Sequence, residues 1–285
     1  MKILPQLLKV QTITPMVDKG TWPKVECSKT SCNIDLQPAT SLWWPPPPQV
    51  TLGIDEVHVW RANLDQPTSH LQRFREILAP DELDRVERYY FPVDQHRFIA
   101  ARGSLRSILS NYMNLEPSQI QFRYNPHGKP ELVSDSSETC LRFNLAHSNG
   151  VALYAVARGQ RVGVDIEYIR ADVSLDQIAR HCFSTQEYST FCELPAFFQL
   201  EAFYRCWTRK EAYIKAIGQG ITFPLRMFDV SLMPSEPALL LGNQVDPQEV
   251  FRWSLRELTP APGYAAAVAV EGHSWKISCW QLQVS

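Results

Sequence analysis

The stretch 203–220, FYRCWTRKEAYIKAIGQG, decides how the rest of the chain is organised. Its apolar residues recur at helical spacing and would form one stripe along a helix: Phe203, Cys206, Trp207, Tyr213, Ile214 and Ile217. Gly218 and Gly220 follow the last apolar turn, where a left-handed C-terminal cap favours glycine. The sequence therefore predicts one amphipathic helix that ends at about Gly218.

Two charged residues, Glu211 and Lys215, lie one turn apart on the flank of this stripe. Glutamate followed by lysine at i,i+4 is a common surface ion pair on helices, and the stretch taken alone favours that interpretation. The alternative is a catalytic pair, because a carboxylate and an ammonium group at the edge of a buried face can act together on a bound substrate. A second stretch, considered below, changes this balance.

Composition and charge limit the class of protein. The chain has 285 residues, of which 45% are hydrophobic and 20% charged, and this suits a soluble protein with one large or two small cores. A net charge of −2 argues against nucleic acid as a partner. The sequence has no apolar run of membrane-spanning length, and we expect no signal peptide in the opening residues. Seven scattered cysteines suit reduced thiols, so we expect a cytoplasmic protein without a membrane partner.

Three segments follow from the distribution of residue types. Residues 1–50 are a Pro-rich appendage that we predict to be poorly ordered; its end, WWPPPP (43–48), favours an extended polyproline conformation. We interpret this end as a stiff linker or as a strap with Trp43 and Trp44 packed on the body, rather than as a docking ligand for another domain. Residues 51–160 and 161–285 then form two halves.

The two halves share an order of elements. A helix opened by Pro80 and a long helix from Asp94 to Tyr112 precede strands in the first half. In the second half, a capping box at 184–187 precedes the helix of 203–220. The segments LAPDELDRVERYYF (78–91) and FSTQEYSTF (183–191) occupy corresponding places, which indicates a pseudo-repeat. Further strands are expected at 57–60, 120–124, 141–145, 151–157, 161–166, 227–230, 251–257, 264–270 and 275–281.

The second informative stretch is GVDIE (163–167). Asp165 and Glu167 lie two residues apart in an expected strand, so their side chains point to one face. Acids at a strand end in solvent would give the same pattern, and the motif alone is weak. Together with Glu211 and Lys215, however, it would supply three carboxylates and a cation, which suits Mg²⁺ and a phosphate substrate.

Two other stretches suit a phosphate ligand. Gly128-Lys129-Pro130 is a turn with a fixed lysine, and Asn144 to Ser148 ends a strand with polar groups that include His147. A solvated turn lysine and a satisfied loop histidine are equally good interpretations of Lys129 and His147 taken singly.

These motifs, taken in order, resemble those of the 4'-phosphopantetheinyl transferases. The resemblance rests on GKP (128–130), FNLAHS (143–148), GVDIE (163–167) and WTRKEAYIKAIGQG (207–220). It covers residues 51–281 and is to the longer, two-domain type that activates carrier domains of peptide and polyketide synthetases. The set of four motifs is specific, although no single motif is.

The resemblance implies an α+β fold, a pseudo-dimer of two similar halves with the active site between them. It implies coenzyme A as co-substrate, bound by residues 51–160, and Mg²⁺ with the catalytic helix in residues 161–285. The phosphopantetheine arm would pass to a serine of an apo acyl or peptidyl carrier protein, releasing adenosine 3',5'-bisphosphate. We expect a monomer.

The resemblance also implies roles for particular residues. Asp165, Glu167 and Glu211 match the metal ligands, and Lys215 matches the lysine on the phosphates. Glu211, or a metal-bound water, would take the serine proton. Coenzyme A would be held by these residues: Lys129, His147, Asn144, Arg85, His96 and Arg97. Glu82 and Ala146 stand where relatives often have a basic and a hydroxyl residue. The alternative function is a catalytically inactive paralogue that binds coenzyme A or carrier proteins as a regulatory or assembly module.

Overall fold

Two β-sheets form the centre of the computed structural model. The first has the strand order β11 (Lys276–Gln281), β1 (Glu56–Asn63), β5 (Val151–Arg158) and β4 (Leu141–Ser148). The second has the order β6 (Val162–Tyr168), β10 (Tyr264–Glu271) and β9 (Trp253–Leu258). The structure describes residues 42–133, 140–220, 223–234 and 236–284, and residues 40–285 belong to one compact unit. The prediction for residues 1–41 therefore lies outside the described residues.

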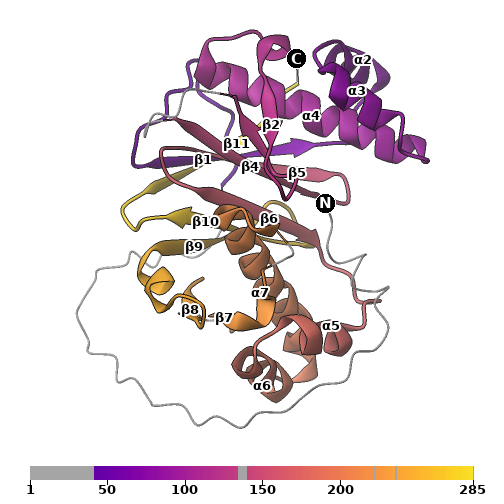
Figure 1. Ribbon diagram of the computed structural model, residues 1–285. Helices are drawn as coiled ribbons and strands as arrows, with labels where there is room; N and C mark the ends of the chain where they lie inside the picture. Colours follow the sequence, from indigo (N-terminus) through magenta and orange to yellow (C-terminus); the bar gives the residue numbers. More distant parts are fainter. Residues whose placement is uncertain (1–41, 134–139, 221–222, 235, 285) are drawn as a thin grey trace. The chain divides into compact units, whose positions relative to one another are not determined.

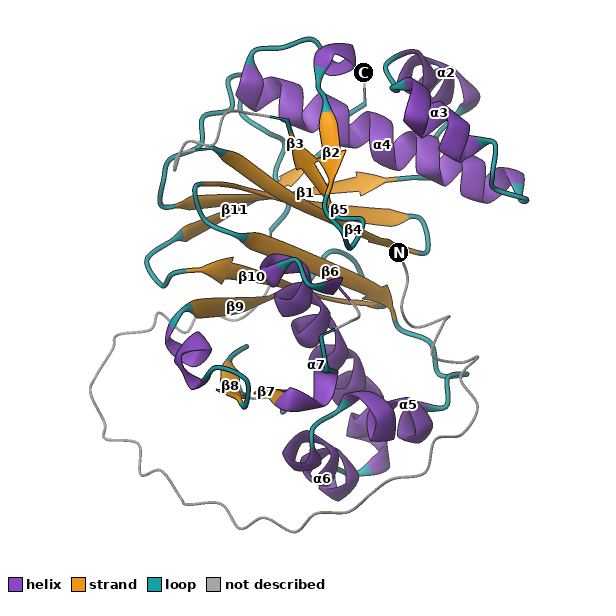
Figure 2. Ribbon diagram, viewed as in Figure 1, coloured by secondary structure: helices purple, strands orange, loops and turns teal. Residues whose placement is uncertain are grey.

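Alternating side chains make the two sheets stack face to face. Val57 and Val59 of β1 share one buried cluster with Val162, Val164 and Ile166 of β6. The intervening residues point to the outer faces, which two long helices cover. Helix α4 (Pro92–Met113) lies on the first sheet and α7 (Ala196–Ile217) on the second, so the unit of residues 40–285 has four layers in the order helix, sheet, sheet, helix (Figures 1 and 2).

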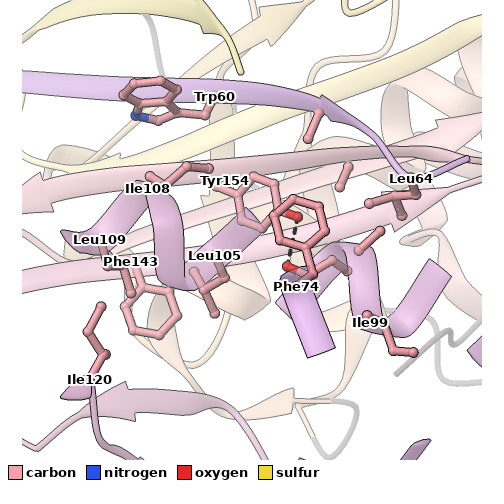
Figure 3. Close-up of a cluster of buried hydrophobic side chains, with 14 of the residues drawn as sticks. Trp60, Leu64, Phe74, Ile99, Leu105, Ile108, Leu109, Ile120, Phe143 and Tyr154 are labelled. Carbon is pink, nitrogen blue, oxygen red and sulfur yellow. Dashed lines mark hydrogen bonds between the residues drawn. The ribbon is translucent and has the colours of Figure 1, made fainter. Parts of the chain in front are cut away.

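The outer face of the first sheet forms its own hydrophobic core with α4 and α2 (Thr68–Glu76). Trp60 and Tyr154 of the sheet meet Leu105 and Ile108 of α4 there, with Phe74 of α2 (Figure 3). The hydroxyl of Tyr154 donates to the backbone carbonyl of Ala101 at 2.9 Å, so the polar group of this buried ring is satisfied (Figure 3).

Helix α7 packs very closely on β6. A Cβ at Gly163 would overlap the backbone of Ala212 and Ala216, so only glycine permits this approach. The helix ends as predicted, with Gly218 in the left-handed conformation (φ 76°) and its N–H bonded to the carbonyl of Ile214. Its start at Ala196 is earlier than the predicted stretch.

The elements that lead into each long helix confirm the pseudo-repeat. In α3 (Pro80–Val86), the carboxylate of Glu82 accepts the backbone N–H of Ala79 at 2.9 Å. In α6 (Thr185–Glu193), the predicted capping box is present, with the Glu187 carboxylate accepting the N–H of Ser184 at 2.8 Å. Both glutamates are buried and form ion pairs with the following long helix: Glu82 with Arg102 and Arg106, and Glu187 with Lys210.

The remaining elements are short. They are α5 (Leu175–Cys182), the hairpins β2 (Phe122–Tyr124) with β3 (Pro130–Leu132) and β7 (Phe228–Val230) with β8 (Leu240–Asn243), and the 3₁₀ turns Pro117–Gln119, Leu225–Met227 and Pro247–Phe251. The predicted strands that began at 120 and 251 begin two residues later, because 3₁₀ turns precede them. Helix α2 and the strands β3 and β8 were not predicted.

The end of the Pro-rich segment forms the predicted strap, but only the Trp43 side chain packs on the body, and that of Trp44 is exposed. Trp44 pairs with Trp280 at the outer edge of β11. The backbone N–H of Trp44 donates to the carbonyl of Cys279 at 3.1 Å. The indole N–H of Trp43 donates to the carbonyl of Thr259 at 2.8 Å, in the loop before β10. This strap covers an edge of the first sheet and contacts the second half. None of the described helices is both long and apolar enough to cross a bilayer.

Candidate active site

The site is built where α7 crosses β6. Because strand side chains alternate, Gly163, Asp165 and Glu167 face away from the cluster that joins the two sheets, and Gly163 lies directly against α7. Asp165 is 3% exposed, so it is an acid at the edge of the core and not a solvated strand end. The predicted common face for Asp165 and Glu167 is therefore present.

The surface-pair interpretation of Glu211 and Lys215 is wrong. Glu211 is 3% exposed, and the ammonium of Lys215 bonds the Oδ1 atom of Asp165 at 2.6 Å. Among the described residues, no ion pair within 4.0 Å joins Lys215 to Glu211 itself. The helix and the strand thus bring a lysine and two acids together, although the acids lie 46 positions apart in the chain.

The electrostatics follow from burial and mutual charge. Burial, together with the nearby Asp165 charge, raises the pKa of Glu211 to about 8. Burial alone would lower the pKa of Lys215, but the charges of Asp165 and Glu211 outweigh it, so the pKa is raised. The lysine is therefore charged at neutral pH, and Glu211 can hold or release a proton there.

Two buried carboxylate oxygens have no hydrogen-bond partner among the described residues: Oδ2 of Asp165 and Oε1 of Glu211. A buried oxygen without a partner is costly, and oxygens of this kind are the ligands that Mg²⁺ prefers. In the described part of the chain, however, no three His, Cys, Asp or Glu side chains already converge as a metal-binding set. The donor types fit a hard cation, with Asp165 and Glu211 as the better-placed ligands.

Strand β4 closes the other side of the site. The Oδ1 atom of Asn144 accepts the N–H of Val164 at 2.8 Å, and the Ser148 hydroxyl accepts the N–H of Tyr168 at 3.1 Å. The same hydroxyl donates to the Oε2 atom of Glu167 at 3.0 Å. Side chains of β4 therefore satisfy the free edge of β6. We predicted no role for Ser148 from the sequence. It lies two residues after Ala146, and this spacing puts both residues on the same face of β4.

Asn144 and His147 have different surroundings. Asn144 is buried and uses its carbonyl oxygen on β6, so its observed contact is structural. His147 is exposed, on the face of β4 opposite to Ser148.

Lys129 lies in the β2–β3 turn against the end of α7. Its ammonium donates to the carbonyl of Lys215 at 2.6 Å and to that of Val162 at 3.3 Å. Burial lowers its pKa to about 8. The lysine thus joins the hairpin to both elements of the site.

Arg85, His96 and Arg97 lie around the start of α4. Arg85 is exposed, with its guanidinium 5.5 Å from the ring centroid of Phe98, and His96 is exposed. Arg97 forms a two-bond ion pair with Asp65, at 2.7 and 3.1 Å. None of the described ion pairs joins these three side chains to the acids on β6 and α7.

Two residues inside the WTRKE stretch hold α7 in place by packing and by an ion pair. Trp207 is buried and stacks on Phe203, with the ring planes 7° apart. Lys210 is fully buried and holds Glu187 of α6 at 2.6 Å. Lys210 thus faces α6, and the next residue, Glu211, lies about 100° further round α7 on the side that carries the charged site.

Comparisons with known proteins identify the relatives of this chain. A family model described as the 4'-phosphopantetheinyl transferase superfamily matches residues 161–269, and one for the N-terminal part of these transferases matches residues 60–158. The 4'-phosphopantetheinyl transferase HetI of Nostoc sp. is 44% identical over 84% of this chain and 97% of its own length. The transferase Sfp of Bacillus subtilis is 33% identical over 72% of this chain and 88% of its own.

Among solved structures, the holo-[acyl-carrier-protein] synthase of Thermotoga maritima covers 39% of this chain and 62% of its own, with a TM-score of 0.31 and 17% identity. The sequence relatives define a group-transferring enzyme, and two family models match its two successive halves. The chain belongs to the 4'-phosphopantetheinyl transferase family, in its longer type, and its reaction is phosphopantetheinyl transfer.

Proposed function

We propose that this transferase moves the 4'-phosphopantetheine arm of coenzyme A onto a serine hydroxyl of an apo acyl or peptidyl carrier protein. Adenosine 3',5'-bisphosphate is the leaving product, and Mg²⁺ is the cofactor. The observation that carries the proposal is the pair of buried, unpartnered oxygens of Asp165 and Glu211 beside the ammonium of Lys215. A site of that charge pattern suits a cation and a pyrophosphate together.

Asp165, Glu167 and Glu211 would hold the metal ion, which when bound would offset charge on the pyrophosphate oxygens. Lys215 orients Asp165 and adds positive charge at the same place. Ser148 fixes the Oε2 side of Glu167, so it is a positioning residue. Glu211, whose raised pKa suits a group that accepts a proton near neutral pH, or a water beside it, takes the serine proton.

The proposal assigns coenzyme A to residues 51–160 and the metal and catalytic helix to residues 161–285. The meeting of the two family matches between residues 158 and 161 supports this division. Lys129, His147, Asn144, Arg85, His96 and Arg97 would bind coenzyme A away from the reacting bond. Replacing Lys129 or His147 by alanine should therefore raise KM for coenzyme A more than it lowers kcat. We further propose that the enzyme is a cytoplasmic monomer that has no nucleic-acid or membrane partner.

Mass spectrometry of an apo carrier protein incubated with enzyme, coenzyme A and Mg²⁺ tests the proposal. The carrier should gain one phosphopantetheine, and a chelator should abolish the gain. Glu211→Gln should slow transfer by about a hundredfold or more, the scale for one general base. Glu201→Gln is the matched control: it makes the same change in α7 at a half-exposed acid that pairs with Arg205, and transfer should stay normal.

An inactive paralogue would bind coenzyme A and leave the carrier mass unchanged under all of these conditions. Normal transfer by a folded Glu211→Gln protein would refute the roles proposed for the site while leaving the reaction itself in place.

A further inference from the structure

The residues between the two stacked sheets change from apolar to polar at one end of the sheets. On β1, the side chains that face the second sheet are Val57 and Val59, and Arg61 follows them on the same face. On the neighbouring β11, Ile277 and Cys279 pack against the same cluster.

In this register Arg61 lies opposite Gln281, the next residue of β11 on that face. Both strands therefore switch from apolar to polar at the same level, where a longer apolar core would need a third pair of hydrophobic residues.

A pocket of about 380 Å³ occupies this polar end, a volume within the usual range of small-molecule sites. Its walls come from four places: the end of β1, the β4–β5 turn, the loop before β10 and the end of β11. The lining residues include Arg61, Asn63, Asp65, Asn149, Ala261 and Gln281.

Arg61 provides the positive charge of the pocket, and the partners that the structure describes for it are uncharged. Its Nε donates to the Oε1 atom of Gln281 at 2.6 Å, and its Nη1 donates to the backbone carbonyl of Pro260. The guanidinium lies 5.2 Å from the ring centroid of Trp43 in the strap. Within the described ranges, Nη2 has no hydrogen-bond partner and no carboxylate pairs with Arg61. Partial burial lowers its pKa, because desolvation disfavours the charged form of the guanidinium.

The acid in the wall, Asp65, does not supply the missing charge. Both of its oxygens are engaged by Arg97, at 2.7 and 3.1 Å. The pair Asp65–Arg97 is neutral overall, so the pocket keeps the net positive charge of Arg61. The amides of Asn63, Asn149 and Gln281 add further polar groups but no charge.

We propose that this pocket is a binding site for a small anion whose carboxylate or phosphate group pairs with Arg61. A guanidinium matches both groups in shape and charge, and each would offset the charge that the protein leaves unpaired. The lining includes none of the residues assigned to phosphopantetheinyl transfer. The pocket is nevertheless next to that site, because the turn that supplies Asn149 and Gly150 follows Ser148, which bonds Glu167.

The test is the melting temperature of the full chain in increasing sodium phosphate or sodium acetate, with sodium chloride at matched ionic strength as the reference. An anion that binds the folded state raises the melting temperature in a saturable way, which gives an apparent Kd. Three variants isolate the pocket. Arg61→Gln removes the cation, and Ala261→Phe fills the space from an exposed loop while keeping Arg61.

The third variant, Arg256→Gln, is the matched control. Arg256 is an exposed arginine 5.3 Å from the ring centroid of Trp275, and no described carboxylate pairs with it. Any phosphate bound at the proposed transfer site contributes equally to all variants, so the differences between them report the pocket alone and do not depend on transfer activity.

We expect at least one anion to stabilise the wild type and Arg256→Gln alike, with an apparent Kd at least about tenfold weaker in Arg61→Gln and Ala261→Phe. A response to phosphate alone identifies a phosphate group, and a response to acetate identifies a carboxylate. The proposal is overturned if neither anion stabilises the wild type beyond chloride. Equal responses in Ala261→Phe and Arg256→Gln overturn it as well, and they do so even if Arg61→Gln does not fold.

Discussion

The two long helices occupy corresponding places in the two halves, yet only one of them carries the candidate active site. Helices α4 and α7 each have 22 residues and cover the outer face of a sheet. Arg106 lies fourteen residues after the start of α4 and Lys210 fourteen after the start of α7, and each pairs with the buried capping glutamate of the preceding short helix. The supporting frame is the same in both halves.

The next positions differ. Glu211 and Lys215 of α7 correspond by the same count to Ser107 and Asn111 of α4. The strand beneath α7 presents Asp165 and Glu167, whereas β1 presents His58 and Trp60 toward α4. The Nδ1 atom of His58 and the indole N–H of Trp60 bond the hydroxyl of Tyr112, at 2.8 and 2.7 Å.

One half uses the space between helix and strand for a charged site, and the other fills it with an aromatic cluster. The buried ion pair with the capping glutamate is common to both halves and supports the fold, whereas two positions on each element differ and carry the candidate site.

The largest expected effect is the loss of stability when the ion pair with a capping glutamate is broken. Lys210→Met should destabilise the protein by about 3–5 kcal/mol, because Glu187 would be left buried without a cation. Arg102→Met should cost less, since Arg106 still pairs with Glu82 at 2.7 Å. Urea unfolding followed by circular dichroism measures both changes. Equal losses of unfolding free energy in the two variants would show that Arg106 does not compensate for the loss of Arg102.

The second prediction separates packing from chemistry. Gly163→Ala should cost about 3 kcal/mol, because the added methyl overlaps the backbone of α7 and must push the helix from β6. Gly103→Ala, whose methyl would overlap the ring of Phe74, should also destabilise, by about 1–3 kcal/mol.

Transfer by the folded fraction should fall in Gly163→Ala, where Glu211 moves relative to Asp165, and stay normal in Gly103→Ala. Carrier modification measured well below the melting temperature checks this, and a loss in Gly103→Ala of the same size would contradict it.

The third prediction concerns the strap, which pairs with β11 at the edge of the first sheet and bonds Thr259 in the loop before β10. A chain that begins at Leu42 should have the stability and activity of the whole protein. A chain that begins at Gln49 should lose about 2 kcal/mol, because it lacks the two backbone bonds between Trp44 and β11 and the Trp43 bond to Thr259. Thermal unfolding compares the two, and identical melting temperatures would show that the strap adds no stability.

The smallest expected effect is a pH dependence at Lys129. Burial lowers its pKa to about 8 in the folded chain, whereas an unfolded lysine titrates near 10.4. Between these values the unfolded state binds more protons, so this lysine makes stability rise with pH across that window.

Relative to Lys129→Met, the wild type should gain about 1 kcal/mol between pH 8 and pH 10, after solvent screening is allowed for. Unfolding free energies of both proteins at the two pH values measure the gain. A constant difference would show that Lys129 keeps its ordinary pKa.

Local sequence determined much of this protein. Helical spacing and Gly218 set the end of α7, the capping box set the start of α6, and alternation put Asp165 and Glu167 on one face. These features depend on residues within one or two turns of each other, so periodicity reveals them. The order of the four motifs was specific enough to indicate the family.

Tertiary structure alone decided which groups meet. The ion pair of Lys215 with Asp165, the bond of Ser148 to Glu167 and the contact of Lys129 with the end of α7 join residues far apart in the chain. Sequence spacing on α7 favoured a surface pair of Glu211 with Lys215, because it contains no information about which strand covers that face. Whether a charge is buried, and which partner offsets the cost, depends on the packing of whole elements, and that packing is settled only when both sheets and both helices are in place.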